Sequence, residues 1–240
     1  MNITINKRAL GLATLILAGA VCSQTTSYGQ STTTYSPTPS TPSLSTDNVG
    51  VLGQSYADLH YSWVNFRGGD VDANGFIAGF EGNTPVARGV DVGLGYNYYR
   101  ENNHRDPFNG SPFDVRFHQV ATHATFFSPM RGMKPFVTGL LGYQWARGDL
   151  QSFRTFGHEW IWGASVGAEI PLGAFALTPR ISYTDTMHSN SVGSWHYGAE
   201  AHHWFTEKVG GYLDATFHEP RGSRGGPDRW TYTAGFRVRF

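Results

Sequence analysis

The last eleven residues, 230–240, read WTYTAGFRVRF and determine the fold class. Every second residue of this stretch is apolar, and the residues between them are Thr, Gly or Arg. Consecutive side chains of a β-strand point to opposite faces of the sheet, so a period of two predicts a strand with one apolar and one polar face.

The same alternation recurs along the chain and predicts ten strands. Their expected ranges are 54–66, 74–82, 89–100, 115–127, 135–147, 157–170, 175–186, 194–205, 209–219 and 229–240. These are long for a soluble protein, where the usual strand has about five or six residues. They suit a tilted strand that crosses a bilayer, which needs about 9–11 residues.

The connections between the predicted strands also alternate. Tight turns are expected at residues 82–85, 128–132, 171–174 and 206–208, and the other connections are mostly longer, such as 101–114 and 220–228. Short turns at one end and longer loops at the other are typical of outer-membrane barrels. An even number of strands places both termini on the short-turn side, which is the periplasm.

The composition excludes several other classes of protein. Among 240 residues, 18 Lys and Arg balance 18 Asp and Glu, so there is no cationic surplus for non-specific nucleic-acid binding. A single Cys excludes an intramolecular disulfide framework. Charged residues are only 15% of the chain, against roughly 25% in an average soluble domain, and aromatic residues are another 15%.

The apolar faces of the strands are expected to point outward, into lipid. An apolar-inside barrel would expose to water a face rich in glycine and poor in charge, which is a poor solvated surface. Ring closure pairs every backbone N–H and C=O, as hydrocarbon requires. We therefore predict an all-β, closed, antiparallel, up-and-down transmembrane β-barrel of ten strands; a secreted β-sandwich or lipocalin-like barrel is the soluble alternative.

The N-terminal region is expected to lie outside the barrel. Lys7 and Arg8 precede an apolar run at 9–21, which predicts a signal peptide at residues 1–22, cleaved after Cys22. Alternatively, Cys22 is the lipid-bearing first residue of a lipoprotein. Residues 23–50 are rich in Ser, Thr and Pro and predict a disordered linker, with the barrel at 51–240.

Several segments resemble a known family. Residues 135–145 read PFVTGLLGYQW, and the stretches WGASVGAE at 162–169 and LTPRISYTD at 177–185 follow it. Together with the terminal Phe240, they resemble small OmpA-like and porin-like outer-membrane β-barrel domains over roughly residues 54–240. The resemblance implies outer-membrane lipid as surroundings and recognition of Phe240 by the barrel-assembly machinery. The common members have eight strands, so eight is the alternative count.

Ionisable residues at inward positions are the candidate functional groups. Those expected to form a lumen charge cluster are Glu81, Glu169, Arg180, Glu200, Arg237 and Arg239. Glu169 and Arg180 flank one tight turn and are expected to pair. Such pairs either fill and rigidify a small barrel or act as a selectivity element in a narrow pore.

No catalytic, cofactor-binding or metal-binding site is predicted. His202 and His203 point to opposite faces, and His218 could approach His196 or His118 only at the extracellular rim. Rim residues that would suit a hydrolase are Asp185, His188, His218, Glu219 and Asp228. The sequence favours a structural or surface-interaction role, with a possible extracellular ligand at the long loops, over a small porin and, third, an outer-membrane hydrolase.

Overall fold

The computed structural model describes residues 49–67, 74–105, 112–150, 153–187, 193–221 and 228–240. Of residues 67, 101–105, 112–115, 146–150 and 153–156 it describes the backbone only. The predicted signal peptide and all but the last two residues of the predicted linker lie outside the described residues. Val49 and Gly50, which were assigned to the linker, belong to the same compact unit as the barrel.

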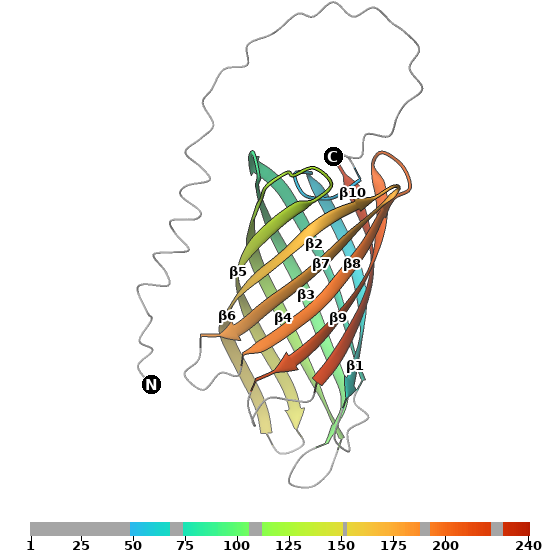
Figure 1. Ribbon diagram of the computed structural model, residues 1–240. Coiled ribbons are helices and arrows are strands. Elements are labelled where there is room, and N and C mark those ends of the chain that lie inside the picture. Colours follow the sequence, from blue (N-terminus) through green and yellow to red (C-terminus); the bar gives the residue numbers. More distant parts are fainter. Residues whose placement is uncertain (1–48, 68–73, 106–111, 151–152, 188–192, 222–227) are drawn as a thin grey trace, which may run out of the picture. The chain divides into compact units, whose positions relative to one another are not determined.

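The described residues form ten antiparallel strands around one closed barrel (Figure 1). The strands are β1 (Tyr56–Arg67), β2 (Asn74–Ala87), β3 (Val90–Arg105), β4 (Pro112–Phe127), β5 (Lys134–Leu150), β6 (Phe153–Leu172), β7 (Phe175–Thr186), β8 (Ser194–Trp204), β9 (Val209–Pro220) and β10 (Asp228–Arg239). Each strand pairs with its neighbours in sequence, and β10 pairs with β1 to close the ring. The prediction of ten strands is confirmed, and the eight-strand alternative is wrong.

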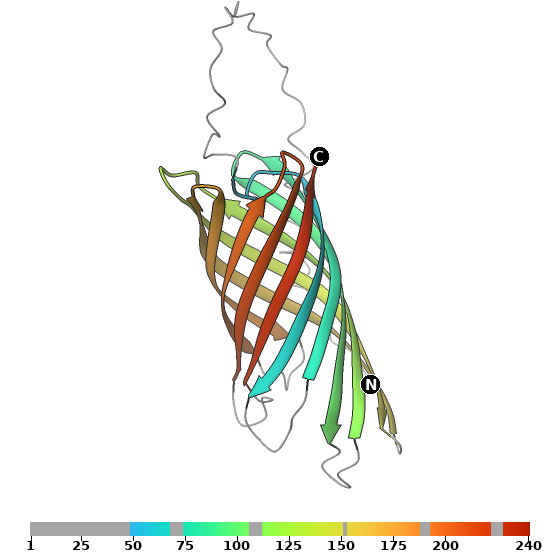
Figure 2. The same ribbon diagram turned by 90° about the vertical axis from the view of Figure 1, so that its right-hand side faces the viewer.

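Five consecutive strands, β2 to β6, are longer than predicted, and the last four of them are the longest in the barrel. β3, β4, β5 and β6 have 16, 16, 17 and 20 residues. Most of the expected loop at 101–114 is therefore strand, and only two residues separate β5 from β6. Figure 2 shows that the β3–β4 and β5–β6 hairpins extend past the other strands. We call this side of the barrel the hairpin end.

The opposite side, which we call the turn end, carries the tight turns. Gly89, Gly132 and Gly173 lie in turns there and have φ angles of 77°, 83° and 65°, a left-handed conformation that glycine adopts without steric cost. The turn predicted at 82–85 is wrong, because β2 continues to Ala87 and the chain turns at Arg88 and Gly89. Pro85 fits in the strand because β2 pairs with β1 only up to Asn83, so the proline has a neighbouring strand on the β3 side alone.

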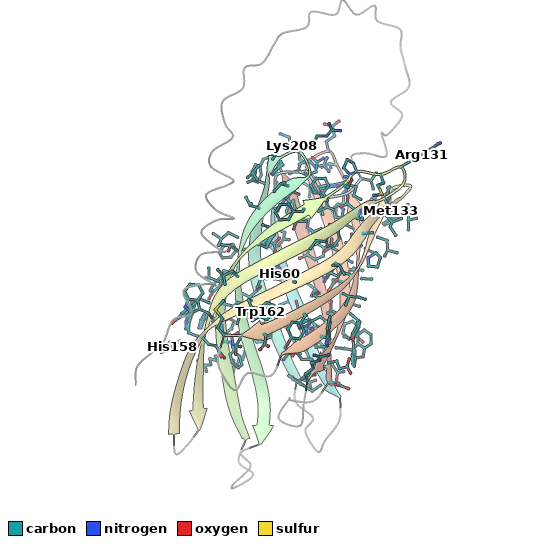
Figure 3. The ribbon with its side chains drawn as sticks, turned by 60° about the vertical axis from the view of Figure 1, so that its left-hand side comes forward. His60, Arg131, Met133, His158, Trp162 and Lys208 are labelled. Atoms are coloured by element: carbon teal, nitrogen blue, oxygen red, sulfur yellow. The ribbon has the colours of Figure 1, made fainter. Side chains whose placement is uncertain are left out.

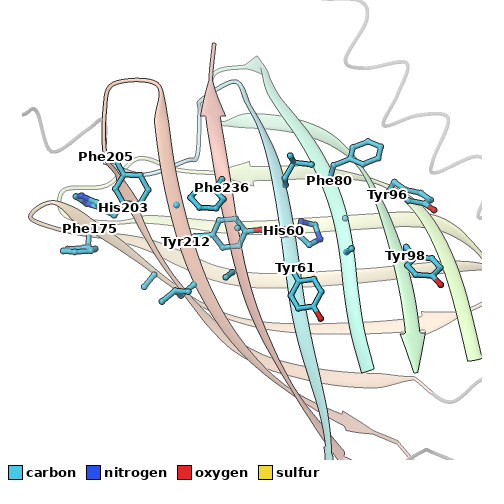
Figure 4. Close-up of a pocket in the computed structure, with 18 residues that line it drawn as sticks. His60, Tyr61, Phe80, Tyr96, Tyr98, Phe175, His203, Phe205, Tyr212 and Phe236 are labelled. Carbon is cyan, nitrogen blue, oxygen red and sulfur yellow. The ribbon is translucent and has the colours of Figure 1, made fainter. Parts of the chain in front are cut away.

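The two faces of the barrel wall differ in polarity as predicted. On the outside, Leu213 and Phe236 are 65% and 66% exposed, whereas the inward Glu169 and Arg237 are 1% and 5% exposed. An open apolar groove also follows the outer wall, and Figure 4 shows aromatic side chains such as Phe80 and Phe236 along it. A soluble barrel or sandwich would bury these residues, whereas acyl chains solvate them.

Among the described residues, no helix has the length and apolar character that membrane crossing by a helix requires.

Candidate functional site: the lumen and its cap

Arg237 is the centre of the charged network inside the lumen. Its terminal nitrogens bind both carboxylate oxygens of Glu200, with Nη2 3.0 Å from Oε2, and its Nε lies 3.4 Å from Oδ2 of Asp58. The guanidinium also lies over the ring of Tyr212, 4.0 Å from the centroid. The Arg237, Glu200 and Asp58 side chains are only 6%, 12% and 3% exposed, so three charges are removed together from bulk water.

A second ion pair joins β7 to β9 beside this centre. Arg180 lies 2.8 Å from Asp214 Oδ2, and it also donates a hydrogen bond to the Thr216 hydroxyl at 3.3 Å. The expected pairing of Arg180 with Glu169 is wrong, because Glu169 lies near the turn end and binds other groups. Arg180 instead reaches across β8, which lies between β7 and β9 in the ring.

Hydrogen bonds continue the network around the other side of the lumen. His60 lies 3.1 Å from Asp58 and 2.8 Å from the Asn97 side-chain oxygen on β3. Tyr56 donates from its hydroxyl to Glu81 at 3.3 Å. Glu81 is in turn 3.8 Å from His123 on β4. Connected polar side chains therefore extend over much of the inner wall.

At the turn end, residues 49–54 enter the barrel and form what we call the cap. The backbone N–H groups of Val51 and Leu52 donate to Glu169 Oε2 at 2.6 and 3.1 Å. Lys134 lies 3.1 Å from the other oxygen of Glu169 and donates to the Leu52 carbonyl at 3.1 Å. A Cβ on Gly50 would overlap the Glu169 carboxylate, so glycine allows this close approach.

Further side chains hold the two ends of the cap. Gly53 donates its N–H to Asp91 at 2.8 Å, and its φ of 82° requires a left-handed backbone. At the other end, the Trp204 indole donates to the Gly50 carbonyl at 3.4 Å. Arg239 lies over the Trp204 ring, 4.0 Å from its centroid. The cap is thus bound by residues from several strands.

The predicted cluster residues do not form one site. Glu200 and Arg237 lie together, Glu81 lies in the adjoining hydrogen-bond network, and Arg180, Glu169 and Arg239 have separate partners. Sequence reasoning missed the cap and Lys134. Lys134 could have been found from its position at the start of the strand that pairs with β6. In the β5–β6 register, Lys134 is the partner of Glu169.

The terminal Phe240 lies on the outside of the barrel at the turn end. It is 78% exposed, and its backbone N–H donates to the Ser55 carbonyl at 3.2 Å.

Two histidines meet in the lumen toward the hairpin end. The Nδ1 atoms of His196 and His218 are 2.6 Å apart, and the Nε2 atoms bind the hydroxyls of Thr184 and Thr231 at 2.6 and 2.9 Å. Of the two partners considered for His218, the structure brings His196 into contact with it. Among the described residues, no group of three or more His, Cys, Asp or Glu side chains is placed to hold a metal ion.

The rim residues considered for hydrolysis are separated in the structure. Asp185 accepts a hydrogen bond from Tyr183 at 2.9 Å, and Glu219 accepts one from Tyr197 at 3.3 Å. His218 faces the lumen, on the opposite side of β9 from Glu219. His188 lies outside the described residues. No acid among the described rim residues therefore orients a histidine there as a general base.

A closed β-barrel with an apolar outer wall and an ion-paired polar interior is an integral membrane β-barrel of the outer-membrane type.

Comparisons with known proteins find solved barrels of similar architecture. Neisserial surface protein A is 14% identical with a TM-score of 0.43, and the match covers 78% of this chain and 97% of that one. The β domain of the Bordetella autotransporter BrkA is 11% identical with a TM-score of 0.47, covering 79% and 100%. The N-terminal β-barrel domain of Pseudomonas aeruginosa OprF is 12% identical with a TM-score of 0.40, covering 78% and 99%. No protein-family profile and no curated protein matches the chain.

Proposed function

We propose that this protein is a non-conducting outer-membrane barrel that acts as a rigid scaffold for surface-exposed hairpins. The observation that carries the proposal is the occupied interior. The Arg237–Glu200–Asp58 centre fills part of the lumen, and the cap at residues 49–54 occupies the turn end. A ten-stranded barrel has room for little beyond its own side chains, so these groups leave no wide aqueous path.

The direction of insertion follows from the two ends. The turn end, with its short connections, lies in the periplasm, and the hairpin end projects from the cell. The β3–β4 and β5–β6 hairpins then present residues 101–105, 112–114, 147–150 and 153–156 at the surface. Binding segments are often carried on a rigid scaffold, so an extracellular ligand would bind there. On the periplasmic side, Phe240 is the residue that the barrel-assembly machinery would read.

Planar-bilayer recording tests the closed interior. We expect the unchanged barrel to give no steady conductance. Glu169→Ala removes the acceptor of two cap N–H groups and should produce openings, whereas Glu207→Ala removes a carboxylate from the exposed β8–β9 turn and should remain silent. A steady ohmic pore in the unchanged protein, lost on substitution of Glu169 or Arg180, would favour the porin alternative.

Surface labelling tests the direction of insertion. An epitope inserted between Asn109 and Gly110 should be accessible to antibody on intact cells, and one inserted after Gly132 in the β4–β5 turn should not. The reverse result would contradict the proposed orientation.

A further inference from the structure

Two imidazole rings face each other inside the lumen, within a chain of four side chains that spans four strands. His196 on β8 and His218 on β9 are register partners, and their rings are nearly perpendicular, at 86° with centroids 4.5 Å apart. Thr184 on β7 binds Nε2 of His196, and Thr231 on β10 binds Nε2 of His218. Because both outer nitrogens are engaged, the two Nδ1 atoms meet, 2.6 Å apart.

The threonine hydroxyls determine which nitrogen of each ring can hold a ligand. In the pair as it stands, one Nδ1 carries a proton and donates it to the other Nδ1, so the two neutral rings are opposite tautomers. When an ion takes the place of this proton, the proton moves to Nε2 of the same ring, and each Nε2–H then donates to its threonine hydroxyl. Both Nδ1 lone pairs become available with no net loss of a proton. Metal-binding histidines are oriented in this way, by a hydrogen bond from the second ring nitrogen.

The spacing of the two nitrogens selects a coordination geometry. Metal–imidazole bonds are about 2.0 Å long, so two ligands at a right angle hold their nitrogens about 2.8 Å apart, two at the tetrahedral angle about 3.3 Å, and two in line about 4 Å. The observed 2.6 Å is nearest to the right-angle arrangement. Square-planar and tetragonal sites of nitrogen and oxygen ligands are typical of Cu²⁺ and Ni²⁺, and Cu²⁺ binds more tightly in the Irving–Williams order.

The position of the pair gives an ion access from the hairpin end. His196 is the third residue of β8, His218 is the third from the end of β9, and both of these strand ends lie at the hairpin end. Both residues are only half-buried. Water can therefore reach the rings and complete the coordination of an ion that two imidazoles hold.

Two arginines on neighbouring strands are directed away from the pair. Arg229 is the register partner of His218, but its guanidinium lies over the ring of Phe66 on β1, 6.0 Å from the centroid. Arg180 lies 2.8 Å from Asp214, with which it forms a pair of no net charge. The charge of Arg229 lowers the affinity for every cation, so the ranking among divalent ions is decided by the ligands and their geometry.

We propose that His196 and His218 bind a Cu²⁺ ion through their Nδ1 atoms at the hairpin end of the lumen, with water at the remaining positions. The site is separate from the Arg237 centre and from the cap. It therefore depends neither on a lumen closed to ions nor on the direction of insertion.

Copper titration of the reconstituted barrel tests the site. The full, untagged barrel in nanodiscs is titrated with Cu²⁺ against a chromophoric chelator, and pulsed electron paramagnetic resonance counts the coordinated imidazoles. We expect one Cu²⁺ held by two imidazoles, and weaker binding of Zn²⁺. Thr184→Val removes the hydroxyl that orients His196 and should weaken copper binding about tenfold. His196→Gln and His218→Gln should each weaken it further and leave a single imidazole on any copper that still binds.

His158→Gln is the matched control, because it removes one imidazole from a different place. His158 is exposed, and Figure 3 shows it on the flank of the barrel where the extended hairpins begin. This variant should bind copper as the unchanged barrel does.

Several results would overturn the proposal. They are a copper signal with fewer than two imidazoles in the unchanged barrel, unchanged affinity in His196→Gln or His218→Gln, an equal loss in His158→Gln, or Zn²⁺ bound as tightly as Cu²⁺. Heat-modifiable gel mobility shows whether each variant forms a closed barrel. If a histidine variant does not, the imidazole count on the unchanged barrel and the copper affinity of Thr184→Val decide the question.

Discussion

Arg237 on β10 binds Glu200 on β8 by reaching over the intervening strand β9 inside the lumen. The guanidinium crosses the face of Tyr212, the β9 residue beneath it, at 4.0 Å from the ring centroid. The pair thus connects three adjacent strands by side chains in addition to their backbone hydrogen bonds, and Asp58 adds a fourth.

Removal of Arg237 should destabilise the barrel strongly. Arg237→Ala leaves the Glu200 and Asp58 carboxylates buried without their cation, and a broken buried ion pair costs about 3–5 kcal/mol. Urea unfolding in lipid vesicles measures the change. Arg131→Ala removes an exposed arginine and should change the free energy of unfolding by no more than about 0.5 kcal/mol. Equal effects of the two substitutions would mean that the central network adds nothing to stability.

Two strand glycines should respond differently to an added methyl group. A Cβ at Gly79 would overlap the Asn97 side-chain oxygen and lie 2.7 Å from the Tyr96 carbonyl, whereas a Cβ at Gly139 would meet nothing within 4 Å. Gly79→Ala should therefore cost about 1–3 kcal/mol through overpacking. Gly139→Ala should be close to neutral. The temperature at which heat-modifiable mobility is lost compares the two, and a Gly139→Ala barrel as unstable as Gly79→Ala would contradict the steric explanation.

A charge in the middle of the outer wall should be costly only if that wall faces hydrocarbon. Leu213 is 65% exposed near the centre of β9, so Leu213→Arg should destabilise the barrel by about 2–4 kcal/mol in a bilayer. Val238, 49% exposed near the end of β10, is the matched position, and Val238→Arg should cost about 0–1 kcal/mol. A Leu213→Arg barrel that unfolds at the same denaturant concentration as Val238→Arg would count against a lipid-facing wall.

Deletion of Phe240 should reduce assembly in cells while the barrel itself remains foldable. The side chain is 78% exposed, so its loss removes little packing. We expect less heat-modifiable barrel in membranes of cells that express the deletion variant, and unchanged refolding of the purified variant in detergent. Phe240→Tyr keeps an aromatic ring and should assemble normally. Normal membrane levels of the deletion variant would contradict a role for Phe240 in assembly.

The strands and their faces were predictable because alternation is local. The outward direction of Leu213 can be read from the alternation of apolar and polar residues within β9 alone, and the same holds in each strand. The prediction of a turn at 82–85 was wrong because Gly, Asn and Pro are typical turn residues. Pro85 is allowed in the strand because β1 begins too late to pair with it, so that its missing N–H has no acceptor to satisfy on that side. The point at which β1 begins depends on the register between two strands and not on the residues near Pro85.

The side-chain partners in the lumen were less predictable for a related reason. Glu169 and Arg180 are close in sequence, yet each inward side chain can also meet groups from strands across the interior. Glu169 binds a segment 117 and 118 residues earlier in the chain, and Arg180 binds a residue two strands away. Such contacts follow from strand tilt and stagger around the ring.

The pairing of β1 with β10 has a consequence for biogenesis. The first and last strands of the barrel pair along their whole length, from Tyr56 with Arg239 to Arg67 with Asp228. The ring therefore cannot close until the last strand is present. A polypeptide truncated before β10 would carry two bare strand edges, and such edges recruit other chains. Synthesis must therefore reach the final strand before the nascent protein can satisfy the backbone groups at both edges of its sheet.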